Sequence, residues 1–323
     1  MIEAAIVGLG RWGRTLVASV QGKSDGFRFT HAVSRDPARV GDFAAQHGLK
    51  IVDRLDAALA EPAISAVVLA TPHSQHLSEI LAGATAGKAV FCEKPLALTR
   101  AEAERAVAAC EKAGIVLGVG HDKRFFPAMA ELARIVAGGQ LGAVLHIEGN
   151  FSNEVAATQF TPWRDSADES PAGGLTGTGI HVLDALVHMA GPVRRVQAKL
   201  IVHKPPPDPH DTLSVLLEFE SGISGMLAAV RSTPMFWRVH VFGRDGSAEA
   251  LGRTELVLRR SGKEPEHLRF ANVDSVRANL EAFADAVAGQ APYPIPMREM
   301  VDVVAAFEAI VSSATADSRA QDV

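Results

Sequence analysis

Residues 4–13 read AAIVGLGRWG, a short apolar run followed by the pattern G-x-G-x-x-G. The apolar run predicts a buried strand, and residues 11–21 predict a helix directly after it. In such a strand–turn–helix, Gly8 allows a tight turn, Gly10 lets the backbone approach a pyrophosphate, and Gly13 allows close helix packing. The helix N-terminus favours the anion. The stretch therefore predicts a dinucleotide-binding domain in preference to a glycine-rich turn without a ligand.

The first third of the chain continues this alternation of strands and helices. Strands are predicted at residues 27–33, 66–70, 89–92 and 116–120, with a weak one near Ile51, and helices at 73–86, 99–113 and from Asp36-Pro37 onward. Near-continuous apolar strands alternating with amphipathic helices predict a parallel sheet that is covered on both faces. Residues 1–122 are accordingly predicted to form a Rossmann domain.

The pattern changes after about residue 122. Helices are predicted at residues 127–137, 181–189, 273–288 and 298–312, and strands at 143–151, 195–202, 212–219, 224–231, 238–242 and 255–259. Runs of adjacent strands predict a mainly antiparallel or mixed sheet. The fold class is therefore α/β, with a C-terminal α+β domain at residues 123–323.

Composition narrows the class of protein. The chain has 323 residues, 47% of them hydrophobic, and a formal net charge of -5 without any basic run, which argues against a nucleic-acid partner. Only Cys92 and Cys110 are cysteines, and they form no CxxC motif, so a reducing cytoplasm is expected. The first residues lack a basic segment typical of a signal peptide, and no apolar stretch approaches the roughly 18 residues of a membrane span.

The end of the second predicted strand should contact the adenosine ribose. An acidic residue there would accept from a 2′-hydroxyl and repel a 2′-phosphate. The chain has Ser34-Arg35 there, with Asp36 one step later. Ser34 can donate to a phosphate and Arg35 can pair with it, which favours NADP(H) over NAD(H). In the alternatives, Ser34-Arg35 is an ordinary turn and Asp36 either caps the next helix or binds the ribose.

Two later strands end in residues suited to the cofactor and the substrate. One ends in Thr71-Pro72-His73 and the other in Glu93-Lys94-Pro95, and both ends should lie at the carboxyl edge of the sheet, where ligands bind in this fold. Pro95 restricts the preceding residue and permits a cis bond, which fixes where Lys94 points. A lysine there can hydrogen-bond a substrate oxygen and assist proton movement. The alternative is a surface lysine without a catalytic role.

These and later motifs give the chain a resemblance to the glucose-fructose oxidoreductase, inositol dehydrogenase and rhizopine-catabolism family (Gfo/Idh/MocA). The resemblance runs from residue 1 to about 312 and is specific as a set, whereas most of its motifs are not specific singly. The shared motifs are Gly8-x-Gly10-x-x-Gly13, Thr71-Pro72 with His76, Glu93-Lys94-Pro95, Arg124-Phe125 followed by Pro127, Trp163-Arg164, Gly173-Gly174, Gly179-x-His181-x-x-Asp184 and Gly243-x-x-Gly246-Ser247.

The resemblance implies a Rossmann domain followed by a domain whose open sheet carries the substrate site and often packs against another subunit. It implies that Lys94 and His181 act at the reacting carbon. The candidate cofactor contacts are Gly8, Gly10, Arg11, Trp12, Gly13, Ser34, Arg35, Thr71, Pro72, His73, His76, Glu93, Lys94, Trp163 and Arg164. The candidate substrate contacts are Lys94, Lys123, Arg124, Thr178, His181 and Asp184. Simple packing is the alternative for Trp12 and Trp163.

One departure from the family pattern concerns the residue four positions before His181. Many family dehydrogenases carry an aspartate there, and this chain has Gly177. Asp184 can take over the missing carboxylate from one turn further on, or Thr178 can hydrogen-bond the substrate instead. Otherwise the chemistry relies more on Lys94, or the substrate is not a typical sugar or cyclitol.

The function predicted from these residues is hydride transfer between nicotinamide and a carbinol or carbonyl carbon of a sugar, sugar derivative or cyclitol. A homodimer or homotetramer is implied by the resemblance. His181, Asp184 and His188 share a helix face, but helical spacing alone is common, so no metal is predicted. The alternative functions are a cofactor-binding redox sensor without turnover, and an elimination or hydrolysis enzyme with tightly held NAD.

Overall fold

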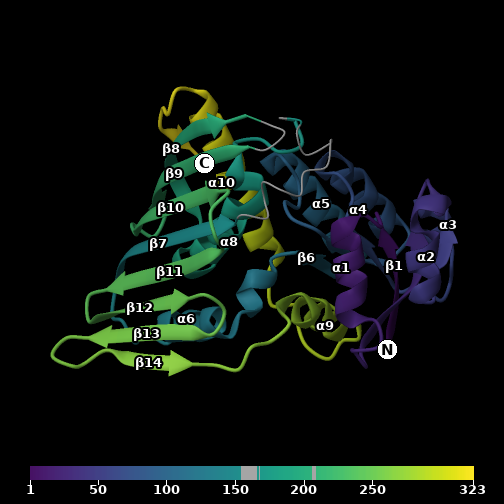
Figure 1. The fold of residues 1–323 in the computed structure, drawn as a ribbon, viewed down its shortest axis with the longest axis horizontal. Coiled ribbons are helices and arrows are strands. Elements are labelled where there is room, and N and C mark those ends of the chain that lie inside the picture. Colours follow the sequence, from purple (N-terminus) through teal and green to yellow (C-terminus); the bar gives the residue numbers. More distant parts are fainter. Residues whose placement is uncertain (154–165, 167, 206–208) are drawn as a thin grey trace. The chain divides into compact units, whose positions relative to one another are not determined.

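The computed structural model describes residues 1–153, 166, 168–205 and 209–323, which form two compact units (Figure 1). The first unit joins Met1–Asp122 with Asp274–Val301, and the second joins Lys123–Val273 with Asp302–Val323. No helix in the described ranges has both the length and the apolarity needed to span a membrane.

The first unit is built on a six-stranded sheet in which every pair of neighbouring strands is parallel. The strand order is β3-β2-β1-β4-β5-β6, so the order reverses between β1 and β4. This confirms the predicted Rossmann fold, in which ligands bind at the carboxyl ends of the strands near that reversal. The strands are β1 (Ile2–Val7), β2 (Phe27–Val33), β3 (Lys50–Val52), β4 (Ala66–Leu69), β5 (Ala89–Cys92) and β6 (Leu117–Val119).

Several helices of the first unit start at a side-chain capping group. The Asp36 carboxylate accepts from the N–H of Arg39, and Pro37 begins the helix that follows. Thr99 caps a later helix through the N–H of Glu102. The helical elements are α1 (Arg11–Val20), α2 (Pro37–Gln46), α3 (Leu55–Leu59), the 3₁₀ turn η1 (His73–Gln75), α4 (His76–Thr85), α5 (Arg100–Ala113) and α9 (Ser275–Val287).

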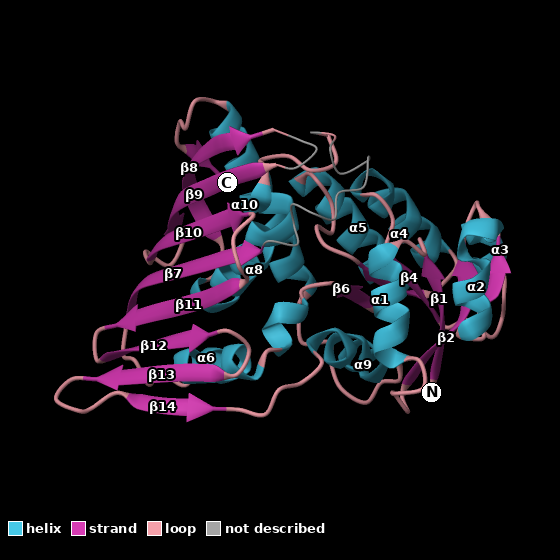
Figure 2. Ribbon diagram, viewed as in Figure 1, coloured by secondary structure: helices cyan, strands magenta, loops and turns pink. Residues whose placement is uncertain are grey.

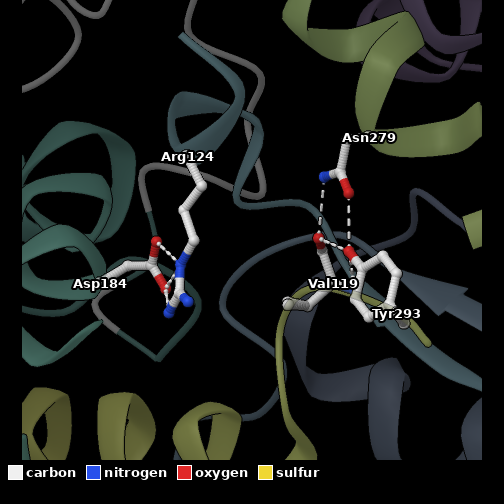
Figure 3. A network of polar contacts seen from close by, with 5 residues as sticks. All are labelled: Val119, Arg124, Asp184, Asn279 and Tyr293. Carbon is white, nitrogen blue, oxygen red and sulfur yellow. Dashed lines mark hydrogen bonds and ion pairs between the residues drawn. The ribbon is translucent and has the colours of Figure 1, made fainter. Parts of the chain in front are cut away.

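The segment Asp274–Val301 belongs to the first unit, to which it is held by α9 and by hydrogen bonds among Val119, Asn279 and Tyr293 (Figure 3). Phe283 of α9 packs edge-on against Phe91 of β5, with ring centroids 5.5 Å apart. The hydroxyl of Tyr293, the only tyrosine, accepts from the N–H of Val119 at 3.2 Å and lies 2.6 Å from Oδ1 of Asn279. Asn279 Nδ2 donates to the carbonyl of Val119. These contacts fix the end of β6 against the returning segment.

The second unit is built on a nine-stranded sheet in the order β14-β13-β12-β11-β7-β10-β9-β8-β15. Among the strands that the structure describes here, only β7 and β10 pair in parallel, so the predicted mainly antiparallel sheet is confirmed. The strands are β7 (Val144–Asn153), β8 (Val193–Lys204), β9 (His210–Phe219), β10 (Ser224–Arg231), β11 (Phe236–Gly243), β12 (Gly246–Leu251), β13 (Glu255–Arg260), β14 (Glu266–Arg269) and β15 (Gln321–Asp322).

One face of this sheet is covered by helices (Figure 2). Along β9, buried Leu213, Val215 and Leu217 alternate with exposed Ser214 and Leu216, as expected for a sheet with one solvated face. The helical elements of this unit are η2 (Asp122–Phe125), α6 (Pro127–Ala137), the π-helix η4 (Leu175–Gly179), α8 (Ile180–Ala190) and most of α10 (Met297–Thr315). Apart from Lys94, the substrate candidates all lie on η2, η4 and α8.

Candidate active site

The glycine loop between β1 and α1 has the geometry of a phosphate cradle. Gly8 has a φ of +89°, and a Cβ there would lie 2.6 Å from the carbonyl oxygen of Ala70. A Cβ at Gly13 would lie 2.1 Å from the carbonyl of Gly8, so both glycines are needed for packing. At Gly10, in contrast, a Cβ would meet no described atom within 4 Å. The N-terminus of α1 also lacks a side-chain cap and an acidic first turn, so its N–H groups suit a pyrophosphate.

The end of β2 presents basic side chains next to this loop. Ser34 follows the last residue of β2, and its hydroxyl exchanges hydrogen bonds with the backbone of Asp36. The Asp36 carboxylate caps α2, as one of the alternatives from the sequence holds. Arg35 and Arg39 are exposed on either side of that cap. The sequence did not single out Arg39, because its position in the first turn of α2 depends on the cap.

The ends of β4 and β5 are joined through a buried histidine. His76 is fully buried; its Nδ1 lies 2.8 Å from the carbonyl of Pro95, and its Nε2 lies 3.2 Å from the carbonyl of Thr71. His73 packs against it with ring centroids 5.6 Å apart. Both histidines were predicted near the cofactor. The geometry gives His76 a bracing role between the two loops, and the Lys94–Pro95 bond is cis.

The carboxylate of Glu79 lies beside Thr71. The hydroxyl of Thr71 donates to Oε2 of Glu79 on α4 at 2.5 Å. Burial raises the pKa of Glu79 to about 7, and the hydrogen bond from Thr71 opposes part of that rise. Glu79 was not predicted as part of this region, because a glutamate in a helix is usually solvated.

Glu93 is enclosed at the end of β5, next to Lys94. A Cβ at Gly120 would lie 2.6 Å from both carboxylate oxygens, so the glycine after β6 makes room for Glu93. Burial raises the pKa of Glu93 to about 7; Asp122 adds to the rise, and Trp12 and Lys94 oppose it. Glu93 also accepts from the backbone N–H of Lys94. The carboxylate therefore orients the backbone that carries the half-buried Lys94 side chain.

In the second unit, a buried ion pair connects η2 with α8 (Figure 3). Nε of Arg124 lies 2.8 Å from Oδ2 of Asp184, and Nη2 lies 2.6 Å from Oδ1, in a two-pronged contact. The side chains are 8% and 1% exposed. Lys123, one residue earlier, stands over the ring of Phe126 at 5.1 Å. Two predicted substrate residues, Arg124 and Asp184, are thus brought together.

His181 is the second residue of α8, one turn before Asp184. Its ring is buried against Phe151 of β7, with ring centroids 6.1 Å apart. Thr178, on η4, is also buried and donates its hydroxyl hydrogen to the carbonyl of Gly174 at 2.7 Å. Gly177 is exposed between these buried neighbours, and a Cβ there would meet no described atom within 4 Å.

Two further sequence predictions concern metals and the Trp-Arg pair. Among the described ranges, no three His, Cys, Asp or Glu side chains lie close enough to hold a metal ion. His188 is exposed, whereas His181 and Asp184 are buried, so the three do not form one cluster. Trp163 and Arg164 lie outside the described residues.

Family profiles match both units. The profile described as "Oxidoreductase family, NAD-binding Rossmann fold" matches residues 2–121, and the "GFO/IDH/MocA C-terminal domain" matches residues 129–249. The chain belongs to the GFO/IDH/MocA oxidoreductase family. This confirms the resemblance inferred from the motifs.

Several relatives of the chain are named as dehydrogenases. Trans-1,2-dihydrobenzene-1,2-diol dehydrogenase of Sus scrofa is 30% identical over 237 residues, covering 72% of this chain and 69% of the relative. D-xylose 1-dehydrogenase (NADP(+)) 2 of Haloferax volcanii is 29% identical over 302 residues, covering 87% and 88%. The structure of levoglucosan dehydrogenase with NADH and L-sorbose is 20% identical, covers 100% of this chain and 98% of that one, and has a TM-score of 0.88.

Proposed function

We propose that the chain is an NAD(P)-dependent dehydrogenase or reductase that acts on CH–OH groups of a small polyol, sugar derivative or diol. The observation that carries this proposal is the open position at Gly10, since a glycine that packing does not require stands at the N-terminus of an uncapped helix. The family's NAD-binding fold and its dehydrogenase relatives support it.

In the proposed reaction, the bound nicotinamide supplies hydride chemistry at its C4 atom. The chain orients the substrate and moves the proton. Lys94 hydrogen-bonds the reacting oxygen, and His181 takes the hydroxyl proton in oxidation or returns it in reduction. The proposed substrate contacts are Lys123, Arg124, Thr178 and Asp184. The proposed cofactor contacts are Arg11, Trp12, Thr71, Pro72, His73, Glu93, Trp163 and Arg164.

Turnover of the dinucleotide tests this proposal. Purified protein is incubated with NADP⁺ or NAD⁺ and with D-xylose or trans-1,2-dihydrobenzene-1,2-diol, and reduced nicotinamide is followed at its absorbance. Lys94→Ala and His181→Ala should each lower kcat by about 10²-fold or more, the usual contribution of acid–base catalysis. Lys112→Ala, an exposed lysine in the last turn of α5, is the matched control. Full turnover in both variants would refute these roles, and tight binding without any turnover would favour the redox sensor.

We also propose a preference for NADP(H). It rests on Ser34 and Arg35 at the end of β2 and on the use of the Asp36 carboxylate as a helix cap. Parallel fluorescence titrations with NADPH and NADH test it. Arg35→Ala should weaken NADPH binding by about ten-fold or more, the effect of one charge-assisted hydrogen bond, and leave NADH binding unchanged. Tighter binding of NADH to the wild type would instead indicate Asp36 as the ribose ligand.

We further infer a cytoplasmic homodimer or homotetramer that binds no nucleic acid or membrane. The exposed apolar side chains of Leu216 and Met226, on the uncovered face of the nine-stranded sheet, support pairing through that face. Light scattering coupled to gel filtration tests it, and a strict monomer at micromolar concentration would refute it.

A further inference from the structure

A buried ion pair lies behind the Gly173-Gly174 turn of the second unit. Asp211 lies at the start of β9 and Arg231 ends β10, and Nη2 of Arg231 lies 2.9 Å from Oδ2 of Asp211. The two side chains are 4% and 8% exposed. Burial raises the pKa of Asp211, while Arg231, the N–H of Gly174 and His203 oppose the rise.

The Asp211 carboxylate also holds the turn itself. The N–H of Gly174 donates to Oδ1 of Asp211 at 2.9 Å. Gly173 has a φ of +57°, and a Cβ there would lie 2.8 Å from Oδ2 of the same carboxylate. The two glycines therefore let the backbone approach a buried charge that larger residues would exclude.

From this turn, a continuous set of contacts leads to His181. The carbonyl of Gly174 accepts from the hydroxyl of Thr178, so Gly174 is held through its N–H by Asp211 and through its carbonyl by the π-helix. A Cβ at Gly179 would lie 3.2 Å from Cβ of Ala229, so the π-helix packs closely on β10. The next residues begin α8, and His181 is its second residue.

A buried ion pair is a weak source of stability, because the cost of desolvating two charges offsets their attraction. Apolar residues would fill the same space between β9 and β10. The carboxylate is useful for a different reason: it accepts a backbone N–H in a glycine-rich segment that has little intrinsic helix preference. π-helical turns are also concentrated at functional sites.

We infer that Asp211 and Arg231 are positioning residues for His181, acting through the turn at Gly173-Gly174 and the π-helix η4. This inference rests on the proposed catalytic role of His181. Neither residue needs to contact the substrate or the cofactor. Loss of the pair would let residues 174–181 move, and small displacements of a catalytic group lower turnover by up to about 10²-fold.

Hydrogen exchange followed by mass spectrometry tests whether the Asp211–Arg231 pair holds residues 174–181 in place. In Asp211→Asn, amide exchange in residues 174–181 should rise by about ten-fold, since the charged acceptor of the Gly174 N–H is lost. The double variant Asp211→Leu/Arg231→Met removes both charges, so the second unit stays folded while the turn still loses its acceptor. Glu218→Gln, an exposed member of an ion pair on the same strand, is the matched control. Unchanged exchange in 174–181 in both Asp211 variants would overturn the inference.

A double-mutant cycle tests whether Asp211 affects turnover through His181. Turnover of NADP⁺ with D-xylose and with trans-1,2-dihydrobenzene-1,2-diol is compared for wild type, Asp211→Asn, His181→Ala and the combined variant. A residue that acts through His181 should lower kcat by about 10–100-fold in the wild type and have no further effect in His181→Ala. Equal losses in both backgrounds would overturn the inference. If the wild type binds the cofactor and turns over neither substrate, the proposed function fails, and exchange in residues 174–181 still decides whether the pair holds that segment.

Discussion

Replacement of Glu79 by glutamine should change how the stability of the first unit depends on pH. Burial raises the pKa of Glu79 from 4.5 to about 7. A raised pKa in the folded state gives stability that is fully present below about pH 4.5 and is lost as the pH rises through about 7. The loss amounts to about 3 kcal/mol, because a tenfold change in proton affinity corresponds to roughly 1.4 kcal/mol. Glutamine keeps the shape and an oxygen that accepts from Thr71, but it carries no charge at any pH.

Urea unfolding of the cofactor-free protein, followed by circular dichroism, measures this effect. The stability of Glu79→Gln relative to the wild type should rise by about 3 kcal/mol between pH 4.5 and pH 8. Glu93 contributes equally to both proteins, so its titration cancels in the comparison. Glu264→Gln, at an exposed position, is the control and should show no such rise. A difference between Glu79→Gln and wild type that stays constant with pH would refute the reasoning.

Two further substitutions test other parts of the fold and the site. Tyr293→Phe should lower the free energy of unfolding by about 1–3 kcal/mol in urea titrations, because the N–H of Val119 and Oδ1 of Asn279 lose a buried partner. Gly177→Ala should raise the free energy of unfolding by about 0.5–1 kcal/mol, because the residue is helical and exposed and its φ is not positive. The same substitution should lower turnover, because Gly177 lies in η4 next to the candidate substrate residue Thr178. Gly41→Ala in α2 has a similar open position outside the site, and it should be stabilising without loss of turnover.

The parallel half of the fold was predictable because its signals are local. Each apolar strand is followed by a turn and an amphipathic helix, and right-handed crossovers leave few topologies for such a chain. The return of Asp274–Val301 to the first unit was not predictable in this way. The helix of that segment follows from its periodicity, but the pattern of one helix does not say which sheet it covers. That information lies in side chains far apart in the sequence, such as Phe91 and Phe283.

The strands of the second unit were predicted less completely. β12 has the sequence GSAEAL, and alanine and glutamate favour helices, so no strand was predicted there. Its residues nevertheless pair with β11 on one side and β13 on the other. Sheet pairing and burial of Ala248 and Ala250 override the intrinsic preference.

The same distinction explains which parts of the candidate site could be predicted from the sequence. Gly8, Gly10 and Gly13 are recognisable because their roles depend on the backbone of one short loop. The π-helix η4 contains Gly177 and Gly179 in five residues, a composition that argues against any helix. It is held by the carboxylate of Asp211, a residue more than thirty positions away. The adjacent glycines of the turn, Gly173 and Gly174, could be recognised in the sequence. Asp211 could not, because a contact between residues so far apart in the chain leaves no local pattern.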